Sequence, residues 1–368
     1  MKNRRQIGII TFHRANNYGA VLQNLALINE IKKYNDVEVH TIDYRCKYLE
    51  APYEKNPFCI KTNNLIKKIL YYFRKMVNQK NYELLNNGFE SFREKYLNMT
   101  ESYVPDTISD SIKEMDVFIT GSDQVWNDVI TNGDSIYSLG FVKGRRTVSY
   151  AASAGRSTNV GNKTKKNIMK IDYISVREQE LKEYIENYSK KNVELVCDPV
   201  FLLSKKEWEG ILSQNRKIKD KYIFTYSVSE KTEEVIKIAK KIAKEKNYKI
   251  VHLDHSLKYG KKGVKKYGAN PLEFVELIRD AEFVIASSFH AVAFSIIFKK
   301  NFIVVPTEKT RSRIDNLLNL MNIENRSVDS YEKYIESSMK EETIYEDTKK
   351  MKKLIDNSKK FIEESIIQ

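Results

Sequence analysis

The densest chemical signal in the sequence is a short polar turn between two apolar runs, centred on His290. The run 283–286 is typical of a buried strand and 289–298 of a helix, and Ser287 or Ser288 could cap that helix. The N–H groups and positive dipole end at a helix start attract anions. His290 could therefore donate a hydrogen bond to a phosphate or act as a general acid. The alternative is a packed histidine beside an ordinary cap.

A second strand, 115–121, ends in a similar polar turn. Gly121 permits close approach of the backbone, and Asp123 is a candidate general base toward a sugar hydroxyl. The other side chains of this turn that could bind a sugar are Ser122, Gln124, Trp126 and Asn127. The alternative for Asp123 is to cap the next helix.

The turn after the first strand, 7–12, is also unusually polar for a connector. Asn16, Asn17 and Tyr18 are predicted to form a substrate loop, and His13 and Arg14 could add contacts to an anion. The single glycine in this turn excludes a GxGxxG dinucleotide loop.

Three arginines stand where they could bind a carboxylate or phosphate, which the guanidinium fork matches well. Arg177 lies at the end of strand 173–176, and the alternative for it is a surface ion pair. Arg311 and Arg313 follow strand 302–305 and could complete a cationic pocket near His290. The alternative for these two is a solvated basic loop.

The elements that must position these residues alternate between strands and helices, which predicts an α/β fold with mostly parallel sheets. The predicted strands are 7–12, 37–43, 115–121, 146–152, 173–176, 193–196, 222–227, 249–253, 283–286 and 302–305. The predicted helices are 18–34, 178–187, 231–246, 271–281, 289–298 and 341–367. The pattern divides the chain into two βα-repeating halves, 1–205 and 206–335, and a C-terminal helical segment, 336–368.

Composition excludes several classes of protein. The chain has 368 residues and three cysteines without CxxC spacing, which argues against a disulfide framework and a zinc site. No run is long enough for a membrane-spanning helix, and the N-terminus does not resemble a signal peptide. The net charge of +14 comes from lysines spread along the chain, and no nucleic-acid-binding motif accompanies it. The sequence has no DxD, Walker A, GxSxG or HExxH motif. We therefore expect that the protein uses neither a metal nor another cofactor.

The segment 65–77 has apolar residues at helical spacing on one side and lysines and an arginine on the other. Such a helix can lie on an anionic membrane. The more common arrangement, which the sequence favours, is a core helix with a solvated lysine face.

Together these residues resemble the polysaccharide pyruvyl transferase family. The matching stretches follow in order along about the first 320 residues: 9–23 (IITFHRANNYGAVLQ), 118–127 (FITGSDQVWN), 149–155 (SYAASAG), 175–178 (SVRE), 198–203 (DPVFLL) and 287–298 (SSFHAVAFSIIF). The resemblance implies two Rossmann-like domains in a GT-B-like arrangement, with the N-terminal domain on the acceptor side and the C-terminal domain on the donor side. It also implies transfer of a pyruvyl group from phosphoenolpyruvate to two hydroxyls of a sugar.

By this resemblance, His290 would be the acid or the phosphate ligand, Arg177 a clamp on phosphoenolpyruvate, and Asp123 the base for the acceptor. Some similar proteins carry an arginine two positions before the motif histidine, where this chain has Ser288. Arg311 or Arg313 would have to supply the missing cation.

The partners implied are phosphoenolpyruvate and a saccharide acceptor, which could be a lipid-linked precursor of a bacterial exopolysaccharide. The expected location is the cytoplasm, with peripheral contact at the inner face of the membrane. Two other functions remain open from the sequence: a GT-B-like glycosyltransferase that uses a nucleotide sugar, and a non-catalytic saccharide-binding protein.

Overall fold

The computed structural model describes residues 4–50, 64–66, 68, 69, 73, 79–227, 230–253, 265, 266, 269–337 and 345–368. The chain forms two compact units. Unit 1 consists of Met1–Leu203 together with Leu354–Gln368, and unit 2 is Ser204–Lys353.

Unit 1 is built on a parallel seven-stranded sheet in the order β3-β2-β1-β4-β5-β6-β7. Its strands are β1 (Arg5–Ile10), β2 (Val37–Tyr44), β3 (Met99–Tyr103), β4 (Val117–Thr120), β5 (Arg146–Ala152), β6 (Tyr173–Val176) and β7 (Val193–Leu195). Strand β4 is entirely buried, and β1 and β5 are mostly buried, as is usual for the central strands of a parallel sheet.

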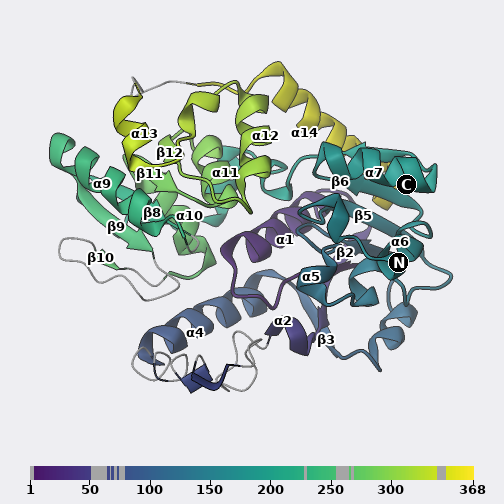
Figure 1. The fold of residues 1–368 in the computed structure, drawn as a ribbon. Helices are drawn as coiled ribbons and strands as arrows, with labels where there is room; N and C mark the ends of the chain where they lie inside the picture. Colours follow the sequence, from purple (N-terminus) through teal and green to yellow (C-terminus); the bar gives the residue numbers. More distant parts are fainter. Residues whose placement is uncertain are drawn as a thin grey trace. The chain divides into compact units, whose positions relative to one another are not determined.

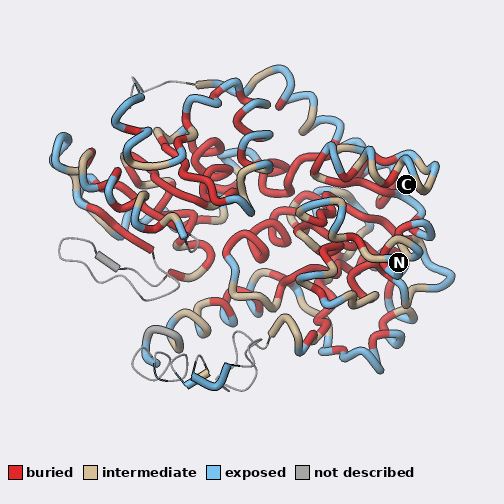
Figure 2. The backbone as a smooth tube through the Cα atoms, in the orientation of Figure 1, coloured by how far each residue is buried: buried red, intermediate tan, exposed pale blue. Residues whose placement is uncertain are grey.

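In its described residues, unit 1 contains the helices α1 (Tyr18–Ile31), α2 (Lys47–Glu50), α4 (Gln79–Tyr96), α5 (Asp128–Thr131), α6 (Asn162–Ile168) and α7 (Gln179–Ser189). Helix α14 (Lys349–Ile362) begins in unit 2 and belongs to unit 1 from Leu354 onward. Helix α1 is buried on nearly every side and packs on β2 and on the 3₁₀ turn Pro199–Phe201. Figure 2 shows it red along its length, whereas α7 alternates buried and exposed residues.

Unit 2 contains a parallel five-stranded sheet in the order β10-β9-β8-β11-β12. Its strands are β8 (Tyr222–Tyr226), β9 (Lys249–Leu253), β10 (Lys265–Lys266), β11 (Phe283–Ala286) and β12 (Asn301–Val304). Its helices are α8 (Lys205–Ile211), α9 (Thr232–Lys246), α10 (Pro271–Asp280), α11 (Phe289–Ile297), α12 (Arg311–Met321) and α13 (Tyr331–Glu336). Apart from α8, these elements are labelled in Figure 1.

The chain returns to unit 1 at its C-terminal end. In α14, the hydroxyl of Ser358 accepts a hydrogen bond of 2.9 Å from the backbone N–H of Cys197. The ring of Phe361 lies 6.4 Å from that of Tyr150 on β5. The last helix therefore completes the core of unit 1, although it follows unit 2 in the sequence.

The predicted α/β class with parallel sheets is confirmed. Two details of the sequence interpretation are wrong. Residues 345–348 are not helical, so the last helix begins at Lys349 rather than at 341, and residues 341–344 lie outside the described part. The core-helix interpretation of 65–77 also fails where it can be examined, because Leu65, Ile66, Ile69 and Phe73 are each at least 59% exposed.

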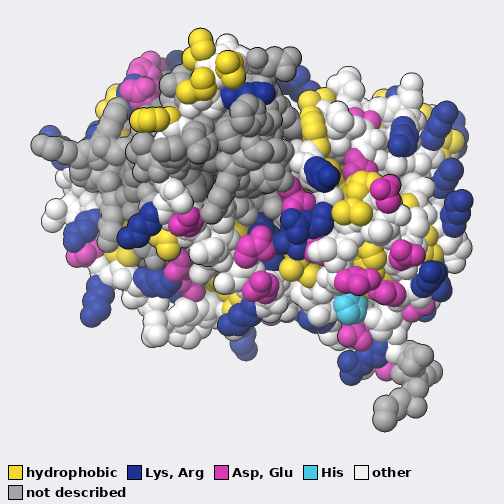
Figure 3. Space-filling model, turned by 90° about the horizontal axis from the view of Figure 1, so that it is seen from below, with side chains coloured by type: hydrophobic (Ala, Val, Ile, Leu, Met, Phe, Trp, Pro, Cys, Tyr) yellow, Lys and Arg dark blue, Asp and Glu magenta, His cyan; other side chains and the backbone are white. Residues whose placement is uncertain are grey.

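Charges are mixed on the face of the molecule shown in Figure 3, where Lys and Arg side chains lie among Asp and Glu. On this face, the described residues form no single basic patch.

Candidate active site

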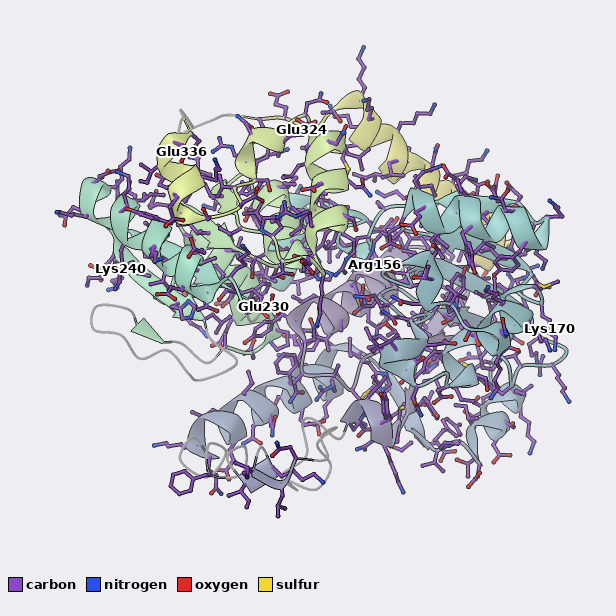
Figure 4. All side chains as sticks on the ribbon, viewed as in Figure 1. Arg156, Lys170, Glu230, Lys240, Glu324 and Glu336 are labelled. Atoms are coloured by element: carbon purple, nitrogen blue, oxygen red, sulfur yellow. The ribbon has the colours of Figure 1, made fainter. Side chains whose placement is uncertain are left out.

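All strands of the unit 1 sheet are parallel, so their carboxyl ends and the turns that follow lie along one edge. Ligands of open α/β sheets bind at this edge. The turns after β4, β5, β6 and β7 place there the polar residues Asp123, Ser153, Glu178 and Asp198. The loop after β5 also carries the exposed Arg156, which is labelled in Figure 4.

The turn after β4 has an unusual backbone. Gly121 has a φ of 115°, and a Cβ at this position would lie 2.2 Å from the carbonyl oxygen of Tyr150. Asp123 also lies in the left-handed region, with a φ of 77°. A residue other than glycine adopts this conformation only where its surroundings hold it. The turn thus fixes the direction of the Asp123 side chain.

Two hydrogen bonds hold Asp123, one to its side chain and one to its backbone carbonyl. Its Oδ1 accepts a hydrogen bond of 2.8 Å from the N–H of Gln124, and its carbonyl oxygen accepts one of 2.9 Å from the N–H of Ser153. The next helix, α5, is capped by Asn127 rather than by Asp123. The interpretation of Asp123 as an ordinary helix cap is therefore wrong.

The other residues predicted around Asp123 have different environments. Ser122 is buried, and its hydroxyl donates to the carbonyl of Ala151 at 3.1 Å. The side-chain oxygen of Gln124 accepts from Asn127 at 2.8 Å. Trp126 is completely buried in the core of unit 1, so no face of its ring is open to a sugar. We therefore remove Trp126 from the candidate site.

Arg177 lies at the centre of a buried ionic cluster at the same edge. Its side chain is 6% exposed and forms ion pairs with Asp198 and, at 3.3 Å, with Glu178. Burial by itself would lower the pKa of Arg177, but the carboxylates of Glu178, Asp198 and Asp123 hold that pKa above its ordinary value. Arg177 is thus a permanently charged, buried residue rather than a surface ion pair.

Ser153 joins this cluster to the Asp123 turn. Its hydroxyl donates to Oε1 of Glu178 at 2.9 Å, while its N–H bonds to Asp123. No role was predicted for Ser153, Glu178 or Asp198. The available signal in the sequence was their position, because each follows a strand directly or within two or three residues.

The turn after β1 is held together by its own side chains. His13 and Arg14 both hydrogen-bond the carboxylate of Asp43. Arg93 of α4 donates to the carbonyl oxygens of His13, at 2.7 Å, and Arg14, at 3.1 Å, and to the side chain of Asn16 at 2.6 Å. The polar residues of this turn thus have structural contacts of their own.

The two remaining residues of the predicted substrate loop also have structural contacts. Asn17 caps α1 by accepting from the N–H groups of Gly19 and Ala20. Tyr18 is buried and stacks on Phe89, with ring centroids 5.2 Å apart. A substrate contact by Asn16, Asn17 or Tyr18 stays a prediction.

In unit 2, the turn between β11 and α11 has the form expected of an anion site. Ser288 occupies the N-cap position of α11, but its side chain makes no capping bond. Ser287 is tied to the preceding strands, since its N–H donates to Tyr226 at 3.1 Å. The first turn of α11 contains no acidic residue, so no carboxylate there opposes the positive end of the helix.

His290 lies in this first turn and is 8% exposed. Its ring meets that of Phe289 edge to face, with centroids 5.2 Å apart. The guanidinium carbon of Arg313 lies 6.0 Å from the ring centroid of Phe289. Phe289 therefore has a histidine and an arginine as neighbours at the start of α11.

The two arginines predicted for this pocket differ in their contacts. Arg311, the first residue of α12, pairs with Asp329 at 2.7 Å. The loop before α12 approaches the turn through Thr310, whose hydroxyl donates to the carbonyl of Ser287 at 3.2 Å. Arg313, rather than Arg311, is the cation placed beside the first turn of α11.

The predicted site residues fall into two groups. Asp123, Gln124 and Arg177 belong to unit 1, and Ser287, Ser288, His290, Arg311 and Arg313 belong to unit 2. Among the described residues, no group of three or more His, Cys, Asp or Glu side chains is placed to hold a metal ion. In the same part of the chain, no helix has the length and apolar character needed to span a membrane.

A family model described as polysaccharide pyruvyl transferase matches residues 17–309. No curated protein matches the chain. The structure of UDP-GlcNAc 2-epimerase from Neisseria meningitidis bound to UDP-GlcNAc is 14% identical, with 99% of each chain covered and a TM-score of 0.52. Another UDP-N-acetylglucosamine 2-epimerase structure is 12% identical, with 99% of this chain and 95% of that chain covered and a TM-score of 0.53. These likenesses confirm the predicted GT-B-like fold class, and at such identities they show the fold alone.

Proposed function

Because the chain belongs to the polysaccharide pyruvyl transferase family, we propose that it transfers a pyruvyl group from phosphoenolpyruvate to two hydroxyls of one sugar. The products are a cyclic ketal and inorganic phosphate. The observation that carries the proposal beyond the family is the start of α11, where His290 and Arg313 both lie beside Phe289 and no acidic residue is present in the first turn.

Phosphoenolpyruvate carries a phosphate and a carboxylate, and both need cationic or N–H partners. The first N–H groups of α11 supply the type of donor that binds phosphate, and the guanidinium of Arg313 suits either group. In this proposal, Arg313 replaces the arginine that some similar proteins carry at the position of Ser288.

The reaction needs proton transfers in both directions. The CH₂ carbon of the enol must gain a proton to become the methyl group of the ketal, and each sugar hydroxyl must lose one. The departing phosphate takes up the remaining proton, so the reaction balances without a redox partner. We assign His290 as the acid toward the enol carbon or as a phosphate ligand, and Asp123 as the base toward a sugar hydroxyl.

The role of Arg177 is less direct. An anionic donor at its guanidinium would compete with the carboxylates of Asp198 and Glu178, which already bind it. We therefore favour a role in which Arg177 holds the strand-end turns of β6 and β7 in place beside Asp123. Binding of a phosphoenolpyruvate oxygen by Arg177 stays a prediction.

The direct test is to incubate the protein with phosphoenolpyruvate and a panel of nitrophenyl glycosides and lipid-linked sugars. We expect phosphate release in equal amount to a sugar whose mass has increased by one pyruvyl ketal. Absence of phosphate release and ketal with the whole panel would contradict the proposal. Thermal stabilisation by UDP sugars but not by phosphoenolpyruvate would instead favour a nucleotide-sugar transferase.

A further inference from the structure

The buried ionic cluster around Arg177 contains two carboxylates that differ in how their oxygens are bound. Both oxygens of Asp198 have partners, because Oδ2 pairs with Arg177 and Oδ1 accepts a hydrogen bond of 3.1 Å from the N–H of Val200. In Glu178, Oε1 accepts from Ser153 at 2.9 Å and lies 3.3 Å from Nε of Arg177. Its Oε2 is buried, and no group in the described part of the chain donates a hydrogen bond to it. Glu178 therefore has one carboxylate oxygen left for a ligand.

The environment of Glu178 makes an unpaired oxygen unfavourable. The residue is 9% exposed, and a buried acceptor that lacks a donor loses its hydration without replacement. Glu178 occupies the N-cap position of α7 but makes no capping bond, so the start of the helix does not use this oxygen either. A catalytic role is one of the reasons for such an exception in a folded protein. The terminal bond of a glutamate rotates over a broad range, so Oε2 can turn toward a hydroxyl donor.

Glu178 and Asp123 follow neighbouring strands of the unit 1 sheet. Asp123 follows β4, Ser153 follows β5 and Glu178 follows β6, and these three strands are adjacent. Ser153 bonds to both acidic residues, through its N–H to the carbonyl oxygen of Asp123 at 2.9 Å and through its hydroxyl to Glu178. Both carboxylates also help to hold the pKa of Arg177 above its ordinary value. Two carboxylates are thus held at one edge of the sheet.

The proposed reaction needs two bases, because two hydroxyls of one sugar each lose a proton. In the first step, one sugar oxygen bonds to the central carbon of phosphoenolpyruvate and the CH₂ carbon gains a proton. The product of this step is an open adduct that still carries its phosphate. In the second step, the other sugar oxygen bonds to the same carbon while the bond from that carbon to the phosphate oxygen breaks. Phosphate leaves with the electron pair of that bond.

We propose that Glu178 is the base of the second step. Its Oε2 accepts the proton of the second hydroxyl, and Glu178 later releases this proton to water, while Asp123 serves the first hydroxyl. This role rests on the proposed function, because it assigns a residue to one step of that reaction. The two carboxylates then select an acceptor that presents two hydroxyls of one sugar to the same edge of the sheet.

Mass spectrometry of the products tests this role. Glu178→Gln is incubated with phosphoenolpyruvate and an acceptor that the original protein converts to the ketal, and the reaction is stopped with alkali. Glutamine keeps an oxygen that accepts from Ser153, but it does not take up a proton at neutral pH. We expect ketal formation to be slower by at least about tenfold. An adduct heavier than the acceptor by a whole phosphoenolpyruvate should accumulate.

Asp198→Asn is the matched control, because it also removes one carboxylate beside Arg177 and keeps an oxygen that accepts hydrogen bonds. It should not accumulate the adduct, since both oxygens of Asp198 have partners in the protein. Glu178→Asp is a second variant, which keeps the negative charge beside Arg177 and so the fold, but withdraws the carboxylate. It should accumulate the same adduct to a smaller extent.

Three results would overturn the role of Glu178 while leaving the proposed function intact. They are ketal formation by Glu178→Gln at the original rate, absence of the adduct from both Glu178 variants, and equal accumulation of the adduct in Asp198→Asn. If the original protein forms no ketal with any acceptor of the panel, the proposed function fails and the role of Glu178 fails with it.

Discussion

The buried ionic cluster around Arg177 in unit 1 and the first turn of α11 in unit 2 differ in how their charges are compensated. In unit 1, Arg177 is buried between carboxylates, and Ser153 extends the same network to Asp123. In unit 2, the first turn of α11 has no acidic residue, and the nearby cation, Arg313, lies over an aromatic ring. The first arrangement compensates its charges internally, and the second leaves positive potential for an anion. We therefore expect removal of the Arg177 charge to affect stability, and substitutions at the turn to affect turnover.

The largest effect on stability should come from Arg177→Met. This change leaves Asp198 and Glu178 buried without their cation, and breaking a buried ion pair from one side costs about 3–5 kcal/mol. Urea unfolding followed by circular dichroism measures the loss. Arg313→Met is the control, and its free energy of unfolding should fall by less than about 1 kcal/mol because Arg313 is partly exposed rather than buried. If the two variants lose equal free energy of unfolding, the ionic cluster of unit 1 contributes no more to stability than the first turn of α11.

The largest effect on turnover should come from His290→Gln. If His290 transfers a proton, kcat falls by about 10²–10³-fold, while folding is retained because glutamine is also polar and of similar length. Initial rates of phosphate release measure this change, with circular dichroism as the check on folding. If kcat stays within about twofold of the value of the original protein, His290 is not the acid.

Substitutions of Arg313 and Arg311 can be compared directly, and the expected effect on the KM for phosphoenolpyruvate is smaller than the effect of His290→Gln on kcat. Arg313→Met should raise the KM for phosphoenolpyruvate by about tenfold through loss of one charge-assisted contact, without changing the KM for the acceptor. Arg311→Met should have little effect on either KM, because Arg311 is engaged with Asp329. A larger effect from Arg311 would reverse our assignment of the cation near Ser288.

The smallest effect we predict is an acid dependence of unit 1. Burial alone would raise the pKa of Asp43, but hydrogen bonds from His13, Arg14 and Ser102 hold the pKa below its ordinary value. A lowered folded-state pKa stabilises the fold above the unfolded pKa of about 3.9, and this contribution disappears as the pH falls below it. We therefore expect the urea midpoint to drop between about pH 5 and pH 2. The drop should be smaller in Asp43→Asn, and an equal drop would mean that other carboxylates are responsible.

The sequence predicts the elements whose residues are buried on both faces. Strands β5, β6, β9 and β11 have the predicted bounds. In each of them at most the first residue is not buried, so the strand contains a largely apolar run that is visible in the sequence. Helix α4 and strand β3 were missed. Helix α4 is mostly polar, and β3 lies at the sheet edge with a partly exposed pattern, so neither has a clear apolar period.

For the candidate site, the sequence indicates where each polar turn lies but not which turns meet. The contact of Arg177 with Asp198 depends on β6 and β7 being neighbours in register, which no local pattern of either strand specifies. Likewise, the choice between Arg311 and Arg313 depends on the direction of each side chain from α12. Both sit in the same short motif, and only one lies beside Phe289.

The return of the chain to unit 1 has a consequence for how the protein is made on the ribosome. Residues 204–353 are inserted between the body of unit 1 and Leu354–Gln368, the stretch that contains most of α14 and supplies Ser358 to Cys197 and Phe361 to Tyr150. Unit 2 can therefore complete its contacts during synthesis, whereas unit 1 must wait for the last helix to emerge. Until then, the apolar surface around Tyr150 lacks its cover, and nascent chains stalled before α14 should be the ones that chaperones retain.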